Sequence, residues 1–164
     1  MVSIVGGAAC SPLEADMAER VGRLLAQRGV VVVTGGRGGV MEAACRGAQA
    51  AGGLTLGLLP GAGWQEANAF LDLALPTNLG DARNALVARA GEAVIAIGGG
   101  PGTLSEIGLA LKAGRRVVGL HSWAAQDGAG KAAQILVAQT PEEAVSLALD
   151  EAYGGEMIGG PWLT

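Results

Sequence analysis

The chain has 164 residues, of which half are apolar and 16% are charged, and this composition excludes a disordered or polyelectrolyte protein. Its length favours one domain with a core large enough to fold without disulfides or metals. The net charge of -4 and the lack of a Lys/Arg cluster exclude an extended phosphate-tracking groove, so we expect no nucleic-acid partner. No apolar run approaches the ~20 residues of a membrane span and the N-terminus lacks a charged signal start, so we expect no membrane partner and a cytoplasmic protein.

Short apolar segments, rich in β-branched residues, alternate along the chain with segments of helical periodicity. Their almost continuous apolar character predicts strands that are buried on both faces, as in a parallel sheet. The predicted strands are residues 2–5, 30–34, 54–59, 71–75, 93–97, 117–120 and 135–138.

Helices are predicted from apolar residues at helical spacing and from the residues that begin or end such segments. Gly29 ends the first helix, and Thr140 caps the last one with Pro141 in its first turn. The predicted helices cover residues 13–28, 40–51, 103–113 and 140–153.

Strands and helices that alternate in this way predict an α/β fold, a Rossmann-like three-layer sandwich around a mostly parallel sheet of six or seven strands. The pattern indicates a single nucleotide-binding domain over residues 1–153. Residues 154–164 have no periodicity and are interpreted as a C-terminal tail.

Glycine-rich turns follow four of the predicted strands, at residues 6–7, 35–39, 61–63 and 98–102. In a parallel sheet these strand ends meet at one edge, where ligands bind. A glycine turn that leads into a helix presents unpaired backbone N–H groups and the positive end of the helix dipole, with no Cβ to exclude an anion. We therefore predict a phosphate site, with tight turns that bind nothing as the alternative. The turns match neither the Walker pattern nor G-x-G-x-x-G.

Three motifs together resemble one superfamily. They are T-G-G-R-G-G-V-M-E at residues 34–42, G-D-A-R-N at residues 80–84 and G-G-G-P-G-T-L-S-E at residues 98–106. The superfamily contains the Lonely Guy phosphoribohydrolases and the molybdenum cofactor carrier proteins, which were formerly described as lysine decarboxylase-like. The resemblance covers residues 2–152.

Departures from the Lonely Guy pattern make the chain more similar to the carrier branch. Arg83 and Glu106 keep the hydrolase spacing of twenty-three positions. However, Gly98 replaces the leading proline of the last motif, Asn84 replaces the lysine after the arginine, and the first glycine turn is one residue shorter. The resemblance implies a protein that binds a phosphorylated nucleotide-like or molybdopterin-type ligand, with the molybdenum cofactor as a candidate. The alternative is a nucleoside 5'-monophosphate phosphoribohydrolase, which releases base and ribose 5-phosphate and needs no cofactor.

The resemblance also implies two candidate catalytic residues. Arg83 would face the ligand, where a guanidinium can hold a phosphate through two parallel hydrogen bonds. Glu106 would reach the sugar hydroxyls or, in a hydrolase, stabilise the positive charge that develops on the sugar. Taken singly, Arg83 would be a surface helix residue and Glu106 a partner of its own helix dipole.

Further candidate ligand-binding residues come from the turns. Arg37 would clasp an anion or cap its own turn, and Asn78 and Thr103 would donate to a phosphate or cap helices. The glycines expected to bind the ligand are Gly7, Gly35, Gly36, Gly38, Gly39, Gly99, Gly100 and Gly102.

The remaining reactive and aromatic side chains give weaker signals. Cys10 and Cys45 are predicted to be free thiols, and His121 has no neighbour at ligand spacing, so no metal site is predicted. Trp64 and Trp123 lie in predicted loops, where they would stack on a heterocycle or lie in an oligomer contact. A homo-oligomer, either a dimer or a tetramer, is expected from the resemblance.

Overall fold

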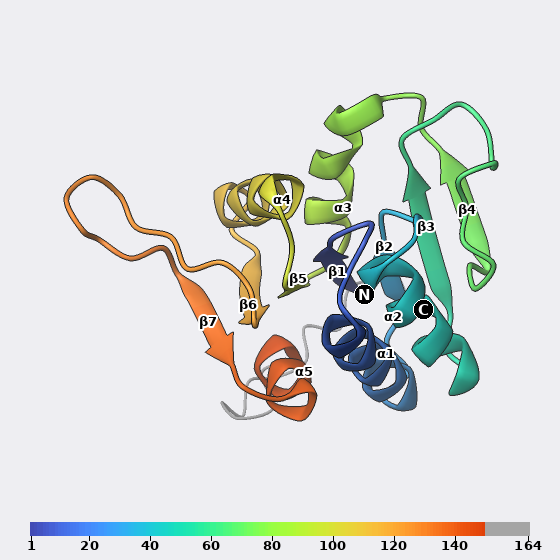
Figure 1. Cartoon of the computed structure of the whole chain (residues 1–164), viewed down its shortest axis with the longest axis horizontal. Helices are drawn as coiled ribbons and strands as arrows, with labels where there is room; N and C mark the ends of the chain where they lie inside the picture. The colour runs from blue at the N-terminus through green and yellow to red at the C-terminus, as the bar shows by residue number, and fades with distance from the viewer. Residues whose placement is uncertain (150–164) are drawn as a thin grey trace, which may run out of the picture.

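The computed structural model describes residues 1–149, which form an α/β sandwich around one sheet of seven parallel strands (Figure 1). The order across the sheet is β4-β3-β2-β1-β5-β6-β7. The predicted fold class is confirmed, including the two strands expected near residues 71–75 and 135–138. The strands are β1 (Val2–Gly6), β2 (Val32–Thr34), β3 (Thr55–Leu59), β4 (Leu73–Pro76), β5 (Ala93–Ile97), β6 (Arg116–Leu120) and β7 (Ile135–Ala138).

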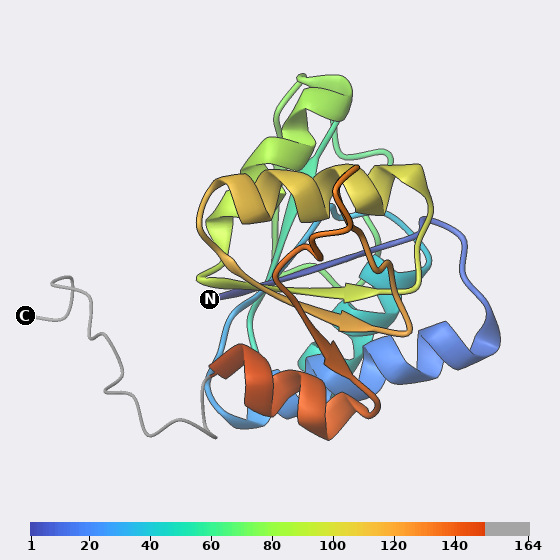
Figure 2. The same cartoon turned by 90° about the vertical axis from the view of Figure 1, so that its left-hand side faces the viewer.

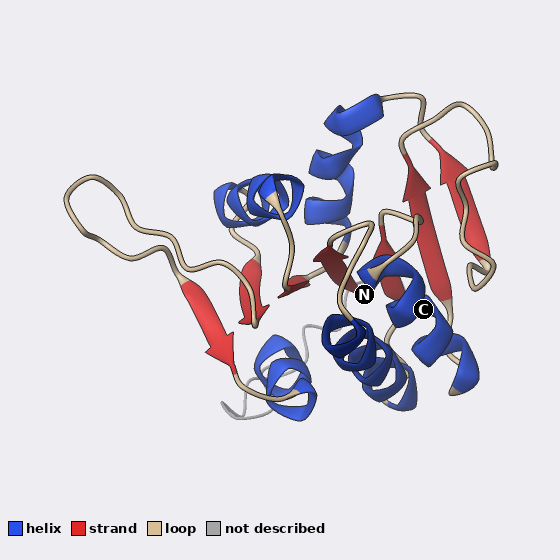
Figure 3. Cartoon of the chain, in the orientation of Figure 1, coloured by secondary structure: helices blue, strands red, loops and turns tan. Residues whose placement is uncertain are grey.

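Helices cover both faces of the sheet, as Figures 2 and 3 show. One layer contains α1 (Pro12–Gln27), α2 (Val40–Ala50) and α5 (Pro141–Leu149), and the other contains the short 3-10 helix η1 (Gly80–Arg83), α3 (Asn84–Ala90) and α4 (Pro101–Lys112). A separate apolar core lies under each layer. Within residues 1–149, the helices are all too short or too polar to cross a membrane.

The helix ends follow their local sequence signals. Ser11 and Glu14 form a capping box at the start of α1, with Pro12 in the first turn. The last predicted helix begins at Pro141, and Thr140 accepts a hydrogen bond from the Glu143 backbone N–H at 3.2 Å. The expected end of that helix and the predicted tail lie outside the described residues.

One helix was missed by the sequence prediction. The seven-residue α3 follows directly on η1, and neither has a side-chain N-cap. A helix of this length forms only because Val87 and Ala88 pack into the core beneath α3 and α4.

The sheet order places a topological switch at its centre. The chain builds outward from β1 through β2, β3 and β4, and then returns to the other side of β1 with β5. The helices that follow β1 and β5, α1 and α4, therefore lie on opposite faces of the sheet, and a ligand crevice is expected at the carboxyl ends of these two strands.

Two glycines let α1 and α2 approach each other closely beneath this crevice. An added Cβ at Gly22 would overlap the carbonyl oxygen of Ala44, and one at Gly47 would overlap the carbonyl oxygen of Glu19. Backbone atoms cannot yield as a flexible side chain does, so any side chain here must separate the helices.

This contact gives a stability prediction. Gly47→Ala is expected to lower the free energy of unfolding by roughly 2 kcal/mol, because the helices must move apart. Gly108→Ala is the matched control, since Gly108 lies in α4 with open space around its Cβ position, and alanine is there expected to stabilise the helix by about 0.5–1 kcal/mol. Urea unfolding of both variants measures the two changes, and equal effects would contradict the close helix contact.

Candidate functional site

A cleft of about 240 Å³ lies at the carboxyl ends of β1 and β5, where the sheet order reverses. The turns after β1, β2 and β5 contribute to it, together with η1. Residues of all three sequence motifs therefore lie together at this edge of the sheet, as predicted. The lining residues are Gly6, Gly7, Ala8, Arg37, Met41, Asp81, Arg83, Asn84, Gly100, Pro101, Gly102, Thr103 and Glu106.

Arg83 and Glu106 form the buried part of the cleft. Arg83 is the last residue of η1 and Glu106 lies in the second turn of α4, so the packing of α3 against α4 brings them together. They are only 6% and 7% exposed, and Arg83 Nη1 lies 3.8 Å from Glu106 Oε1. This distance is an ion-pair contact and too long for a hydrogen bond. Arg83 is therefore not the surface helix residue that its sequence context alone suggests.

Burial controls the ionisation of both groups. Burial raises the pKa of Glu106 from 4.5 to about 7, although the charge of Arg83 opposes the shift. Burial likewise lowers the pKa of Arg83, with Glu106 acting in the opposite direction. In each case the cost of desolvation outweighs the attraction to the partner. The ion pair therefore does not compensate for the burial of its two charges.

One nitrogen of the Arg83 guanidinium is unpaired. Its buried Nε has none among the residues that the structure describes. Gly35 makes room for the group, because an added Cβ there would overlap Nη1. Buried polar groups in native proteins are nearly always paired, so an unpaired guanidinium nitrogen beside a cleft indicates a missing acceptor.

The first turn of α4 forms the next part of the cleft. This helix begins at Pro101 with Gly100 as its N-cap, two residues earlier than predicted, and Gly100 supplies no side-chain cap. The backbone N–H groups of Gly102 and Thr103 thus lack intrahelical partners. Thr103 is a buried first-turn residue, so of its two predicted roles that of helix cap is wrong. Pro101 is a typical first-turn residue, and its presence was the sequence signal for the earlier start.

The glycine turn after β2 contributes mainly one side chain. Only Arg37 of residues 35–39 lines the cleft, and its Nε lies 3.6 Å from Glu66 Oε2. The Gly36 N–H donates to Thr34 Oγ1 at 3.0 Å. Gly39 begins α2 with positive φ, and its Cβ position is filled by the Gly7 carbonyl. Most of this turn therefore packs against its neighbours and does not face the cleft.

The other predicted binding residues divide in the same way. Gly7, Gly100 and Gly102 line the cleft, while Gly35, Gly36, Gly38, Gly39, Gly99 and Asn78 do not. Asn78 is exposed with a φ of 53°, and its N–H donates to the Gly61 carbonyl at 3.0 Å. Gly99 packs under Thr103, which occupies its Cβ position.

The sequence analysis missed several lining residues. Met41 belongs to the first motif, and Asp81 and Asn84 belong to the second. Membership of the motifs was the available signal for all three. Ala8, one residue beyond the first glycine turn, had no such signal.

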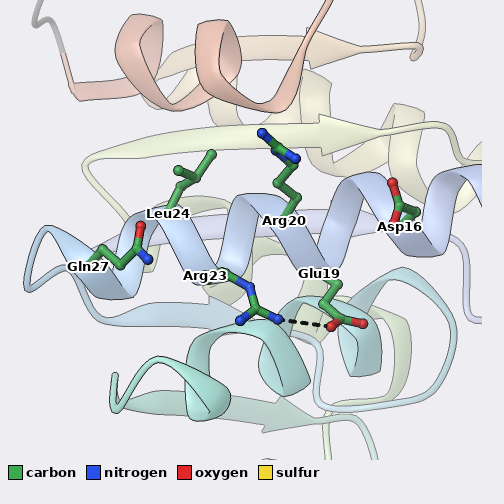
Figure 4. A pocket seen from close by; sticks show the side chains of 6 residues that line it. All are labelled: Asp16, Glu19, Arg20, Arg23, Leu24 and Gln27. Atoms are coloured by element: carbon green, nitrogen blue, oxygen red, sulfur yellow. Dashed lines mark hydrogen bonds and ion pairs between the residues drawn. The ribbon is translucent and has the colours of Figure 1, made fainter.

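A larger hollow, of about 380 Å³, lies on the outer face of α1 (Figure 4). Both arginines in it are partnered at the surface, Arg23 with Glu19 at 3.2 Å and Arg20 with Glu142. It lies along the middle of a helix and contains no helix N-terminus, so we place the functional site in the smaller cleft.

Other candidate side chains lie outside the cleft. Both cysteines are free thiols, as predicted. Residues 1–149 contain no group of three or more His, Cys, Asp or Glu side chains that could hold a metal ion. Trp64 and Trp123 are both exposed, and neither lines the cleft.

Comparison with known proteins identifies the family. The model of the SLOG cluster4 family matches residues 1–145. An uncharacterized protein from Archaeoglobus fulgidus is 38% identical over 151 residues, which are 92% of this chain and 95% of that protein.

Two similar solved structures carry names that concern the molybdenum cofactor. The molybdenum cofactor binding protein of the phototrophic bacterium Rippkaea orientalis has a TM-score of 0.80 and 36% identity, covering 92% of this chain and 94% of that one. The molybdenum cofactor carrier protein of Chlamydomonas reinhardtii has a TM-score of 0.76 and 34% identity, covering 88% and 92%. The resemblance to the carrier branch of the superfamily is thereby confirmed. This chain belongs to the SLOG cluster4 family.

Proposed function

We propose that the chain binds a phosphorylated ligand of nucleotide or molybdopterin type in the cleft and holds it without cleaving it. The observation that carries this proposal is the buried Arg83 guanidinium, whose Nε has no acceptor among the described residues. A buried donor without an acceptor is costly in the ligand-free protein. A phosphate in the cleft would bring negative charge and hydrogen-bond acceptors to this guanidinium.

The surroundings of Arg83 suit an anion. The backbone N–H groups of Gly102 and Thr103 are free for a ligand, and Cβ atoms at Gly100 and Gly102 would meet only open space. The positive end of the α4 dipole adds to the attraction. Arg37 brings a second cation to the cleft, shared with Glu66.

Similarity to the two named cofactor-binding proteins supports a molybdopterin-type ligand. Such a ligand combines a phosphate with a flat heterocycle, and Arg83, Gly102 and Thr103 would hold its phosphate. The cofactor would supply molybdenum chemistry to an acceptor protein, while this chain would bind, orient and shield it. We further propose that the protein is a cytoplasmic homo-oligomer, as the resemblance implies.

Hydrolysis of a nucleoside monophosphate is the second candidate function. Glu106 favours it, because its carboxyl group lines the cleft and, when ionised, could stabilise a positively charged sugar in the transition state. The replacements at Gly98 and Asn84 count against it.

Loss of Arg83 tests the binding site. Arg83→Ala is expected to weaken binding of AMP or of molybdenum cofactor released from a molybdoenzyme at least tenfold, or ~1.4 kcal/mol. Arg83→Lys keeps the charge but loses the guanidinium fork, so it should restore only part of the affinity. Calorimetry measures the AMP affinity, and molybdenum retained after gel filtration measures cofactor binding.

The matched control is Arg23→Ala, which removes an exposed arginine from the larger hollow on α1. It should leave both affinities unchanged. A loss of affinity in Arg23→Ala but not in Arg83→Ala would move the site to α1.

Incubation with AMP and the other nucleoside monophosphates separates the two functions. The binding proposal predicts that the nucleotide is recovered intact, with no free base detected by chromatography. Turnover that disappears in Glu106→Gln would instead establish the hydrolase. Turnover that survives in Glu106→Gln and also in Arg83→Ala would point to a contaminating enzyme.

The raised pKa of Glu106 gives a pH prediction. Below pH 4.5 the carboxyl group is protonated in both folded and unfolded chains, so its full contribution to stability is present. As the pH rises toward 7 the unfolded chain loses this proton first, and the wild type loses about 3 kcal/mol of stability by pH 8. Glu106→Gln should escape this loss.

Urea unfolding at pH 5 and pH 8 gives the change in the free energy of unfolding between the two pH values. This change is then compared between the wild type and Glu106→Gln. Glu92→Gln, on a side chain that is 81% exposed, is the matched control and should lose stability with pH as the wild type does. If the stability of Glu106→Gln and of the wild type changed equally with pH, ionisation of Glu106 would not destabilise the fold, and the prediction would be wrong.

A further inference from the structure

The segment Gly98–Gly99, between β5 and the first turn of α4, has a backbone conformation that strongly favours glycine at both positions. Its two residues have φ values of 52° and 98°. Successive glycines have little conformational preference of their own, so their peptide planes can rotate unless the surroundings fix them. The Gly98 N–H donates to the Leu120 carbonyl at 3.3 Å, which fixes only the first amide.

Both carbonyl groups of this segment are held by consecutive residues of another loop. Ser122 Oγ donates to the Gly98 carbonyl at 2.7 Å, and Trp123 Nε1 donates to the Gly99 carbonyl at 3.1 Å. Neither donor lines the cleft. The two carbonyl oxygens are therefore engaged away from the cleft, where they cannot repel an anion.

Glu14 holds the same segment from the start of α1. Its carboxylate fills the space where a Cβ at Gly98 would lie. Hydrogen bonds from Ser11 lower the pKa of Glu14, and the backbone N–H of Gly99 contributes in the same direction. Glu14 therefore lies against the Gly98–Gly99 segment from the start of α1.

The backbone after β6 is bent to bring the two donors into place. His121, directly before Ser122, has a φ of 50°, and only Asn78 shares such a left-handed conformation among the non-glycine residues described. This conformation is unfavourable for a residue with a Cβ, so the surrounding contacts must maintain it.

We propose that Ser122 and Trp123 are positioning residues, which lock the Gly98–Gly99 peptide planes so that the first turn of α4 is preorganised for an anion. The hydrogen bonds of Ser122 and Trp123 form without any ligand. Their effect on ligand affinity rests on the proposed function. A turn that is already ordered loses less entropy when it binds a phosphate.

Amide hydrogen exchange of the ligand-free protein tests the positioning directly. The double variant Ser122→Ala/Trp123→Phe removes both donors and keeps the aromatic ring. Exchange in a peptide covering residues 98–106 is expected to be at least tenfold faster than in the wild type, while peptides from β1 and β2 stay unchanged. Ser122→Thr retains the hydroxyl and should stay close to the wild type. Unchanged exchange at residues 98–106 would overturn the proposal.

Trp64→Phe is the matched control, because the indole of Trp64 also donates to a backbone carbonyl, that of Ala74 at 3.3 Å, on the far edge of the sheet. It should leave exchange at residues 98–106 unaltered. An equal increase in this variant would show a general loss of stability and would contradict a specific role for Ser122 and Trp123.

Calorimetry with AMP then tests the consequence for binding. The double variant should bind AMP about tenfold more weakly than the wild type, and Trp64→Phe should bind it equally well. Faster exchange without weaker binding would overturn the preorganising role. A wild type that binds no AMP would argue against a nucleotide as the ligand, while the exchange experiment would still decide whether the two residues hold the loop.

Discussion

The incomplete pairing of Arg83 with Glu106 is the constraint on which the candidate site depends. Two oppositely charged groups lie 3.8 Å apart in a buried place, and yet burial shifts the pKa of each toward its neutral form. Burial removes most of the water that would stabilise the two charges. An ion pair at this distance is too weak to compensate for the lost hydration. The fold tolerates this arrangement because η1 and α4 are fixed by the sheet and by the α3–α4 contact. A site that is unsatisfied alone has a physical reason to bind a third group.

Much of the architecture could be predicted because the central strands β1, β2, β3, β5 and β6 are mostly buried. Continuous apolar runs such as 93–97 admit few other interpretations. The strand order, with β5 beside β1, was not predicted, because it depends on pairing between strands far apart in the chain. The short α3 could not be predicted, since its helicity comes from tertiary packing of Val87 and Ala88 and not from a cap or a long periodic pattern.

The glycine motifs indicated where the cleft lies better than which of their residues line it. Gly35 leaves space for the Arg83 guanidinium, and Gly39 leaves space for the Gly7 carbonyl, so both serve the site without facing the cleft. Spacing along the chain cannot reveal such contacts, because they join turns that follow different strands. The burial of Arg83 was hidden for the same reason, since the group that covers it comes from elsewhere in the fold.

The protonation of Glu106 links the electrostatics of the cleft to the choice between holding and cleaving a ligand. An ionised Glu106 would cancel the charge of Arg83, whereas a protonated one leaves the guanidinium charge available to a phosphate. A phosphate held beside Arg83 would in turn favour the protonated carboxyl, so anion binding and proton uptake are coupled. Stabilising a cationic sugar requires the opposite state, an ionised carboxylate next to the bound phosphate. Under the binding proposal, the burial that favours an anion in the cleft also disfavours the ionised carboxylate that hydrolysis would need.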